Sequence, residues 1–233
     1  MTTDFHSLWI GKKLRETELL TLHSFAEKGH FINLWVYDNV SNVPEGIMLK
    51  DANRIIHESK VFKYSEKGKI DWGKGSYAGF SDVFRYKLLY ETGGWWVDTD
   101  VTCLKKFEIK EDYFFRNHWL FPVVGNVMKC PKGSELMLRC YERAVIEVNE
   151  NNNDWHKPIK ILNEEIAKTG LMKYRKLGLF NLDMQHTIEP YLNRNYSFPI
   201  DWIGVHWINS AGINYKRGSA YHSLLKKYGI KWL

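Results

Sequence analysis

The most regular hydrophobic pattern in the chain lies just before residue 93. Phe80, Phe84 and Leu88 recur every four residues, which is the period of an amphipathic helix. Ser81 is a candidate N-terminal cap of this helix, and Gly93 stands where a left-handed residue would end it. The pattern therefore predicts a helix that stops at Gly93.

Aromatic and β-branched residues follow directly, because residues 94–101 read GWWVDTDV. Such residues favour strands over helices. Side chains two positions apart in a strand share a face, so Trp96, Asp98 and Asp100 are expected to point the same way. The sequence thus predicts a strand that carries two carboxylates at its end.

The pair Asp98 and Asp100 suggests a metal site. Neighbouring carboxylates repel each other unless a positive charge lies between them. Mg²⁺ and Mn²⁺ take oxygen ligands and leave room for a substrate phosphate, so either ion suits the pair. A short Asp-X-Asp motif also occurs at solvated strand ends, and the motif alone leaves that interpretation open.

A phosphatase is an alternative, because residues 98–102 (DTDVT) fit the Asp-X-Asp-X-Thr loop of haloacid-dehalogenase-type enzymes, with Asp98 as nucleophile. That loop normally lies near the start of its domain and requires further acidic ligands, usually in an Asp-Asp or Gly-Asp pair. Neither pair follows Asp100. The phosphatase is therefore the weaker interpretation.

The N-terminal region has the pattern of a βαβ unit, with strands at residues 8–11 and 32–38 and a helix at 15–28. This unit predicts a mostly parallel sheet, and ligands of such sheets bind beyond the carboxyl ends of the strands. Three residues are then expected near a site: Trp9, Gly11 and Asp38.

The middle of the chain is less regular. Residues 39–76 are expected to lack regular structure because Pro and Gly interrupt them, whereas residues 113–129 predict two short strands around a turn. Residues 134–149 and 158–169 predict helices.

Towards the C-terminus, residues 178–186 predict a strand that brings Asp183 or Gln185 into a cleft. His206 lies inside a short apolar run, where a histidine is most often a satisfied core residue. The tail at 222–233 predicts a final helix or a segment that lies on an anionic membrane.

Composition and charge narrow the function. The chain has 233 residues, of which 44% are hydrophobic, and we expect one α/β domain over residues 1–233. A formal net charge of +6 indicates an anionic partner, such as a nucleoside diphosphate or an acidic lipid surface. Nucleic acid is not expected as a partner, because no nucleic-acid-binding motif is present.

Cysteine usage and hydropathy predict the compartment. Cys103, Cys130 and Cys140 form no Cys-X-X-Cys motif, which is typical of reduced thiols. No signal-peptide pattern begins the sequence, and no apolar run reaches the roughly 18 residues of a membrane span. These features predict a cytoplasmic protein that is at most peripheral on the inner face of the membrane.

Together these motifs resemble glycosyltransferase family 32, which includes bacterial capsule and lipooligosaccharide transferases. A more distant similarity is to the catalytic domains of the large clostridial glucosylating toxins. The resemblance rests on LWIG at 8–11, LWVYD at 34–38, and above all on the Ser-Asp-X-X-Arg of residues 81–85 followed by GGWWVDTD at 93–100. It implies a GT-A fold, a Rossmann-like mixed sheet flanked by helices.

The resemblance also implies roles in donor binding. Trp9 would stack on the nucleotide base, while Asp82 and Arg85, three residues apart in the predicted helix, would hold the donor sugar. The indole of Trp96 would offer the sugar an apolar face. Asp98 would contact the ribose.

A divalent metal, typically Mn²⁺, is required in this family. By the resemblance, Asp100 would bind the metal directly, Asp98 would act partly through a metal-bound water, and His206 would supply a further ligand. The metal neutralises the charge of a departing nucleoside diphosphate.

The predicted function is retaining transfer of a hexose from a nucleotide sugar to a surface glycan or a lipid-linked oligosaccharide. UDP-galactose is the preferred donor, and UDP-glucose, UDP-N-acetylhexosamine and GDP-mannose remain open. A carbonyl or carboxylate beneath the sugar would stabilise the transition state, and the candidates are Asn126, Asp183 and Gln185. A catalytically silent glycan-binding domain remains a second alternative beside the phosphatase.

Overall fold

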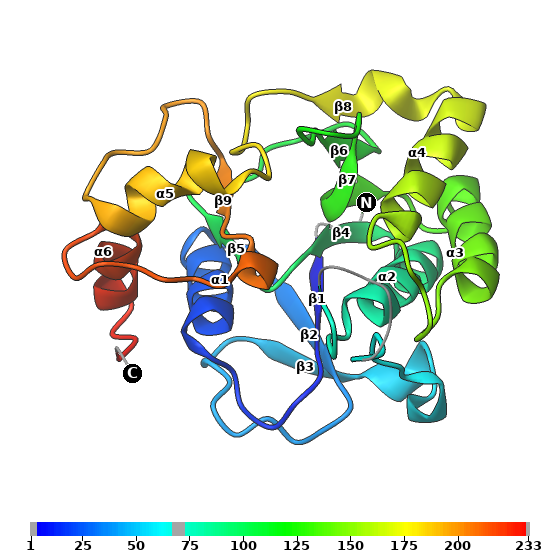
Figure 1. Cartoon of the computed structure of the whole chain (residues 1–233), viewed down its shortest axis with the longest axis horizontal. Helices are drawn as coiled ribbons and strands as arrows, with labels where there is room; N and C mark the ends of the chain where they lie inside the picture. Colours follow the sequence, from blue (N-terminus) through cyan, green and yellow to red (C-terminus); the bar gives the residue numbers. More distant parts are fainter. Residues whose placement is uncertain (1–3, 67–72, 232–233) are drawn as a thin grey trace.

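A computed structural model describes residues 4–66 and 73–231, and its centre is a seven-stranded mixed sheet (Figure 1). The strands in spatial order are β3 (Met48–Asp51), β2 (Ile32–Val36), β1 (Phe5–Trp9), β4 (Gly94–Val97), β7 (Val124–Cys130), β6 (Phe114–Arg116) and β8 (Arg175–Lys176). Strands β3, β2, β1 and β4 are parallel, as predicted from the N-terminal pattern, whereas β7 is antiparallel to both of its neighbours.

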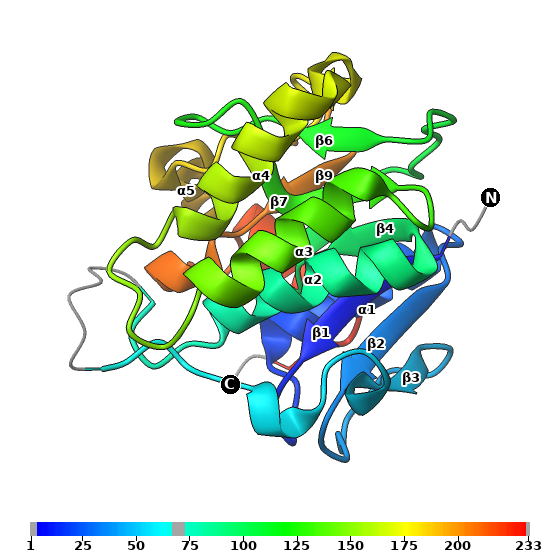
Figure 2. The same ribbon diagram turned by 90° about the vertical axis from the view of Figure 1, so that its right-hand side faces the viewer.

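Helices cover both faces of this sheet (Figure 2). Three of them pack side by side on one face: α2 (Ala78–Thr92), α3 (Glu135–Glu147) and α4 (Lys157–Thr169). Helix α1 (Glu16–Glu27) packs on the other face. Trp95 and Trp96 belong to opposite core clusters, which confirms the predicted alternation of side chains in β4.

A second, two-stranded sheet joins β5 (Val101–Cys103) to β9 (Gly204–His206). The strands are antiparallel, and Val101 pairs with His206. This pairing brings the C-terminal part of the chain against the segment that follows Asp100. Helices α5 (Gln185–Asn193) and α6 (Ala220–Lys227) complete this side of the molecule.

Gly93 ends α2 as predicted, and the backbone requires a glycine there. Its φ is +66°, and a Cβ on it would lie 2.4 Å from the backbone nitrogen of Lys132. Ser81 is not the cap, because the helix begins at Ala78 after Tyr77 and the N–H of Ser81 already donates to the carbonyl of Tyr77.

Two further predictions from the sequence are wrong. The stretch 39–76 contains the edge strand β3 and two short 3₁₀ helices, Ala52–Arg54 and Glu58–Lys60. The stretch 178–186 is a loop that leads into α5 rather than a strand.

The tail forms the helix α6, as one of the two predictions had it. Residues 232–233 lie outside the described part of the chain. In the residues that the structure describes, no helix is both long enough and apolar enough to cross a membrane.

Candidate functional site

A cavity of about 1140 Å³ lies beyond the carboxyl ends of β1 and β4. Its walls come from the first turns of α2, the turn after β4, and the loops around residues 124–126, 183–185 and 206–211. This is the edge at which parallel sheets bind ligands. The predicted residues that line it are Trp9, Asp82, Arg85, Trp96, Asp98, Asp100, Asn126, Asp183, Gln185 and His206.

Asp98 and Asp100 both face this cavity, although β4 ends at Val97 and the two residues belong to a turn. Oδ1 of Asp98 accepts a hydrogen bond from Nε1 of Trp96 at 2.6 Å and lies 3.1 Å from Nη2 of Arg85. The N–H of Asp98 donates to the carbonyl of Asn126 at 2.8 Å, which fixes the turn against β7.

Asp100 is held from the C-terminal side of the chain. Its Oδ2 accepts the N–H of Asn209 at 2.9 Å and lies 3.2 Å from Nε2 of His206. Burial would raise the pKa of Asp100, but His206 and the bond from Asn209 outweigh it and lower the pKa. Asp100 is therefore a stable anion at neutral pH.

The pKa of Asp98 is shifted in the opposite direction. Burial raises it most, the charge of Asp100 raises it further, and Arg85 opposes both. Asp98 thus lies in a place where additional positive charge would be favourable, as expected for a carboxylate next to a metal position.

The two carboxylates fit a divalent cation. In the described part of the chain, Oδ2 of Asp98 and Oδ1 of Asp100 accept no hydrogen bond, so each group keeps one oxygen for a ligand in the cavity. Among all residues that the structure describes, no group of three or more His, Cys, Asp or Glu side chains is arranged around one metal position. Mg²⁺ and Mn²⁺ are commonly bound through one or two carboxylates, with substrate phosphates and water as the other ligands.

His206 has a different environment from the one predicted. Besides Asp100, it contacts Oδ1 of Asp183 through Nδ1 at 2.7 Å. Burial would lower its pKa, but the two carboxylates raise it to about 10. In this structure His206 is a counter-ion of Asp100 and Asp183. A role of His206 as a metal ligand stays a prediction.

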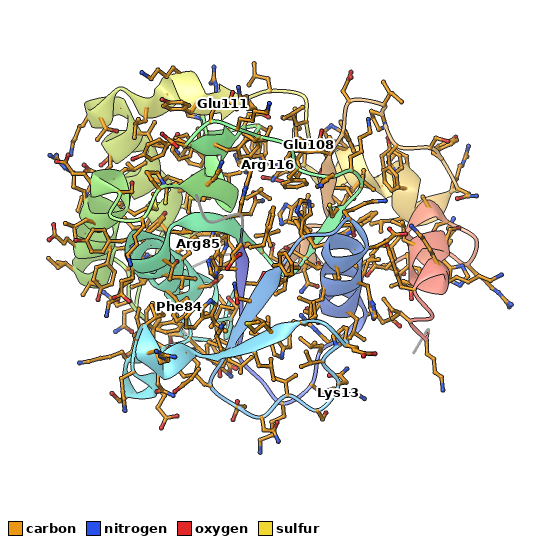
Figure 3. All side chains as sticks on the ribbon, turned by 180° about the vertical axis from the view of Figure 1, so that it is seen from behind. Lys13, Phe84, Arg85, Glu108, Glu111 and Arg116 are labelled. Carbon is orange, nitrogen blue, oxygen red and sulfur yellow. The ribbon has the colours of Figure 1, made fainter. Side chains whose placement is uncertain are left out.

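Asp183 is fully engaged by its neighbours. Arg116 contacts both carboxylate oxygens, at 2.6 and 2.9 Å, and holds Asp183 together with His206. The side chain of Arg116 (Figure 3) is completely buried in β6. Asp183 therefore orients His206 and has little capacity left to contact a sugar.

The pair Asp82 and Arg85 lies on the α2 wall of the cavity. Oδ1 of Asp82 lies 3.2 Å from Nη2 of Arg85, and burial raises the pKa of Asp82 to about 6. Nε of Arg85 is buried without a partner among the described residues. The second oxygen of Asp82 is a suitable group for binding a sugar hydroxyl, whereas the buried Nε of Arg85 is not accessible to a ligand.

Trp96 does not offer an open face to the cavity. Its side chain is 1% exposed, and the guanidinium carbon of Arg85 lies over the ring at 5.0 Å from the centroid. The indole instead orients Arg85 from behind and Asp98 through Nε1.

Of the three residues predicted from the βαβ unit, only Trp9 lines the cavity. Gly11 lies behind Trp9, since a Cβ on it would meet the indole at 3.5 Å. Asp38 follows the end of β2, one strand away from the β1–β4 junction, and does not reach the cavity. The prediction that places Asp38 at the site is therefore wrong.

Several lining residues were not predicted from the sequence, including Arg15, Tyr64, His118 and Trp155. Arg15 directly precedes the predicted helix at 15–28, and the other three come from loops, so no sequence pattern marked them.

Arg116 was also not predicted, although the sequence contained a signal for it, because it is a charged residue that ends the apolar run Phe114–Phe115. A buried arginine requires an anionic partner.

Comparison with known proteins agrees with the geometry. Residues 18–120 match the family described as "Glycosyltransferase sugar-binding region containing DXD motif". The matched residues are therefore similar to the DXD sugar-binding region of glycosyltransferases. The matched residues include Asp82, Arg85, Asp98 and Asp100, whereas Trp9 and His206 lie outside them.

A curated relative is "Subversion of eukaryotic traffic protein A" of Legionella pneumophila subsp. pneumophila (strain Philadelphia 1), 24% identical over 209 residues. The match covers 76% of this chain and 32% of the relative, so the chain spans about a third of that protein's length. Among solved structures, "PaToxG Glycosyltransferase" is similar, with a TM-score of 0.53 and 13% identity over 72% of this chain and 68% of that one. The structural likeness concerns the fold, and with the family match it supports a transferase.

Proposed function

We propose that the domain transfers a hexose from a nucleotide sugar, with retention of configuration, in a reaction that requires Mn²⁺ or Mg²⁺ between Asp98 and Asp100. The observation that carries this proposal is that both aspartates line the cavity and that each has one carboxylate oxygen without a hydrogen-bond donor among the described residues. Retention and membership of family 32 rest on the sequence resemblance.

The bound cation would neutralise the charge that develops on the diphosphate as it leaves the sugar. The protein's own residues position the reactants. Asp82 and Arg85 bind the sugar hydroxyls, and Trp96 fixes both Arg85 and Asp98. On the opposite side, His206 and Asn209 fix Asp100.

A UDP-sugar is the proposed donor, and UDP-galactose is the first to test. The proposed acceptor is a surface glycan or a lipid-linked oligosaccharide. A net charge of +6 supports contact with an anionic membrane, from the cytoplasmic side, while the acceptor is bound.

The test is donor hydrolysis in the presence of Mn²⁺, measured over a panel of UDP- and GDP-sugars. We expect slow release of free sugar from one donor, loss of release with EDTA, and no release by Asp100→Ala. Asp201→Ala, a change of an exposed aspartate that does not line the cavity, is the control and should behave like the wild type.

Two results would contradict the proposal. Glycan binding that is insensitive to EDTA, with no donor hydrolysis, would favour the silent binding domain. Release of phosphate from simple phosphomonoesters, with Asp98 forming a trapped aspartyl-fluoride complex, would favour the phosphatase.

A further inference from the structure

We propose that Arg15, oriented by Glu18, binds the diphosphate of the nucleotide-sugar donor. This inference rests on the proposed function and adds a residue to the donor site. It concerns the loop between β1 and α1, which contributes Lys13 and Arg15 to the cavity lining.

Glu18 is an unusual carboxylate for a first helical turn, because its side chain is 1% exposed. Every hydrogen bond that it accepts comes from Arg15: the backbone N–H at 2.7 Å, Nε at 3.2 Å and Nη2 at 2.7 Å. A fork of this kind fixes the plane of the guanidinium. The side chain of Arg15 is nevertheless 61% exposed, so its remaining donors face outwards.

Arg15 lines the same cavity as Asp98 and Asp100. Its guanidinium carbon lies over the Trp9 ring, at 5.5 Å from the centroid. The charge of Asp100 contributes, after the bonds and charge of Glu18, to raising the pKa of Arg15. Arg15 therefore lies against the indole of the proposed base site, in the cavity that also contains the two aspartates of the proposed metal position.

The cations Arg85 and His206 of the cavity already have carboxylate partners. Arg85 contacts Asp82 and Asp98, and His206 contacts Asp100 and Asp183. In the described part of the chain, Nη1 of Arg15 makes no hydrogen bond. Arg15 thus combines a fixed orientation with free donor capacity.

Lys13 also lines the cavity, on the loop after β1 (Figure 3), and adds positive charge. No hydrogen bond to the described residues fixes its ammonium group. A guanidinium held on one edge can present its other edge to a phosphate, which a mobile ammonium cannot do with the same geometry. The diphosphate contact is therefore assigned to Arg15.

In the transfer, the bond between the anomeric carbon and the diphosphate oxygen breaks and its electron pair stays on that oxygen. The acceptor oxygen forms the new bond to the anomeric carbon, and its proton passes to the departing diphosphate. Arg15 would bind the anion before and after this step, so the contact contributes to both donor binding and turnover.

The experiment compares Arg15→Gln, Arg15→Lys and Glu18→Gln, with Mn²⁺ present. Binding of UDP, GDP and uridine is measured by calorimetry, and donor hydrolysis is measured with the active sugar nucleotide. Arg15→Gln should weaken binding of the nucleoside diphosphate at least about tenfold, as expected for a charged hydrogen bond, and leave uridine binding unchanged. Arg15→Lys should recover part of the loss.

Glu18 is a positioning residue, and its role is tested by coupling. Glu18→Gln should weaken diphosphate binding in the wild-type background, but have no further effect in Arg15→Gln. Melting temperatures identify any variant that fails through loss of folding. The control is Arg139→Gln, which removes an exposed arginine of α3 that pairs with Glu135, four residues away. It should leave nucleotide binding and donor hydrolysis unchanged.

The inference is overturned if Arg15→Gln binds the nucleoside diphosphate and hydrolyses the donor like the wild type, a result that leaves the proposed function intact. Equal weakening of uridine and diphosphate binding would also overturn it, because the contact would then be to the base or ribose. Absence of any nucleoside diphosphate binding to the wild type would overturn both proposals, whereas tight binding without sugar release would contradict the transferase alone.

Discussion

Arg85 and Asp98 form an ion pair of 3.1 Å that connects helix α2 to the turn after β4. Between these two residues the chain passes through the rest of α2, Gly93 and the whole of β4. Since Arg85 also contacts Asp82, a single guanidinium balances two carboxylates at the wall of the cavity. The turn that carries Asp98 and the α2 wall of the cavity therefore depend on the same side chain.

Removing this charge should damage both folding and activity. Arg85→Ala leaves Asp82 and Asp98 without their counter-ion, and loss of one partner from a buried pair typically costs about 3–5 kcal/mol. Urea unfolding should show a loss of this order, accompanied by loss of donor hydrolysis. Arg139→Ala, from an exposed pair on α3, should leave the free energy of unfolding almost unchanged, because solvent screens the pair. Equal stability of the two variants would refute this account.

Metal binding should be visible as thermal stabilisation. At a concentration about 100 times its Kd, Mn²⁺ would add about 2.7 kcal/mol to the stability of the folded state. Asp98→Asn should abolish the increase in melting temperature, because it removes one of the two carboxylates. A Mn²⁺-dependent increase of the same size in Asp98→Asn and in the wild type would exclude this site.

Stability should fall as the pH drops from neutral towards 4, and His6 is one reason. Its side chain is buried, and burial lowers its pKa from 6.5 to about 4, while Nδ1 accepts a hydrogen bond from Nε1 of Trp35 at 3.2 Å. Below pH 6.5 the unfolded chain binds a proton that the folded chain does not, so the contribution of His6 is complete above 6.5 and is lost as the pH approaches 4. The loss amounts to about 3 kcal/mol.

The measurement is the free energy of unfolding in urea at pH values between 7 and 4.5. His6→Asn keeps an acceptor for Trp35 but cannot titrate, so its stability should depend less steeply on pH. An unchanged pH dependence in this variant would assign the effect to other groups.

The requirement for a glycine at the end of α2 can be tested by comparing Gly93 with Gly133, which lies in the turn between β7 and α3. Both have positive φ, +66° and +74°, but a Cβ on Gly133 would meet nothing within 4 Å, whereas one on Gly93 would lie 2.4 Å from a backbone nitrogen. Gly133→Ala should cost about 1–2 kcal/mol through backbone strain alone. Gly93→Ala should cost clearly more, because the β4–β7 side of the turn must move. Similar values in urea unfolding would show that the close contact is easily relieved.

Local patterns predicted the elements around the site well. The helix that ends at Gly93, the strand through Trp95 and Trp96, and the βαβ start of the sheet were all readable from spacing and glycine placement. Strand β3 was missed because it is a short, largely exposed edge strand without alternating apolar residues. The segment before α5 was mistaken for a strand because apolar residues such as Phe180 fill the core from a loop.

The partners of the site residues could not be read from the sequence in the same way. His206 meets Asp100 and Asp183 through contacts that span 106 and 23 positions, and Arg116 reaches Asp183 across 67. Charge state and ligand capacity depend on such long-range contacts. This is why the sequence placed His206 near the carboxylates but did not reveal its ion pairs with Asp100 and Asp183.

The pairing of β5 with β9 has a consequence for how the domain can be divided. The recognisable motif ends by residue 120, yet the strand that fixes Asp100 is supplied some eighty residues later. A fragment that carries only the motif would keep both aspartates and lose the residues that hold Asp100. Moving the aspartate turn into another protein of this fold therefore requires moving β9 and the residues after it together with β5.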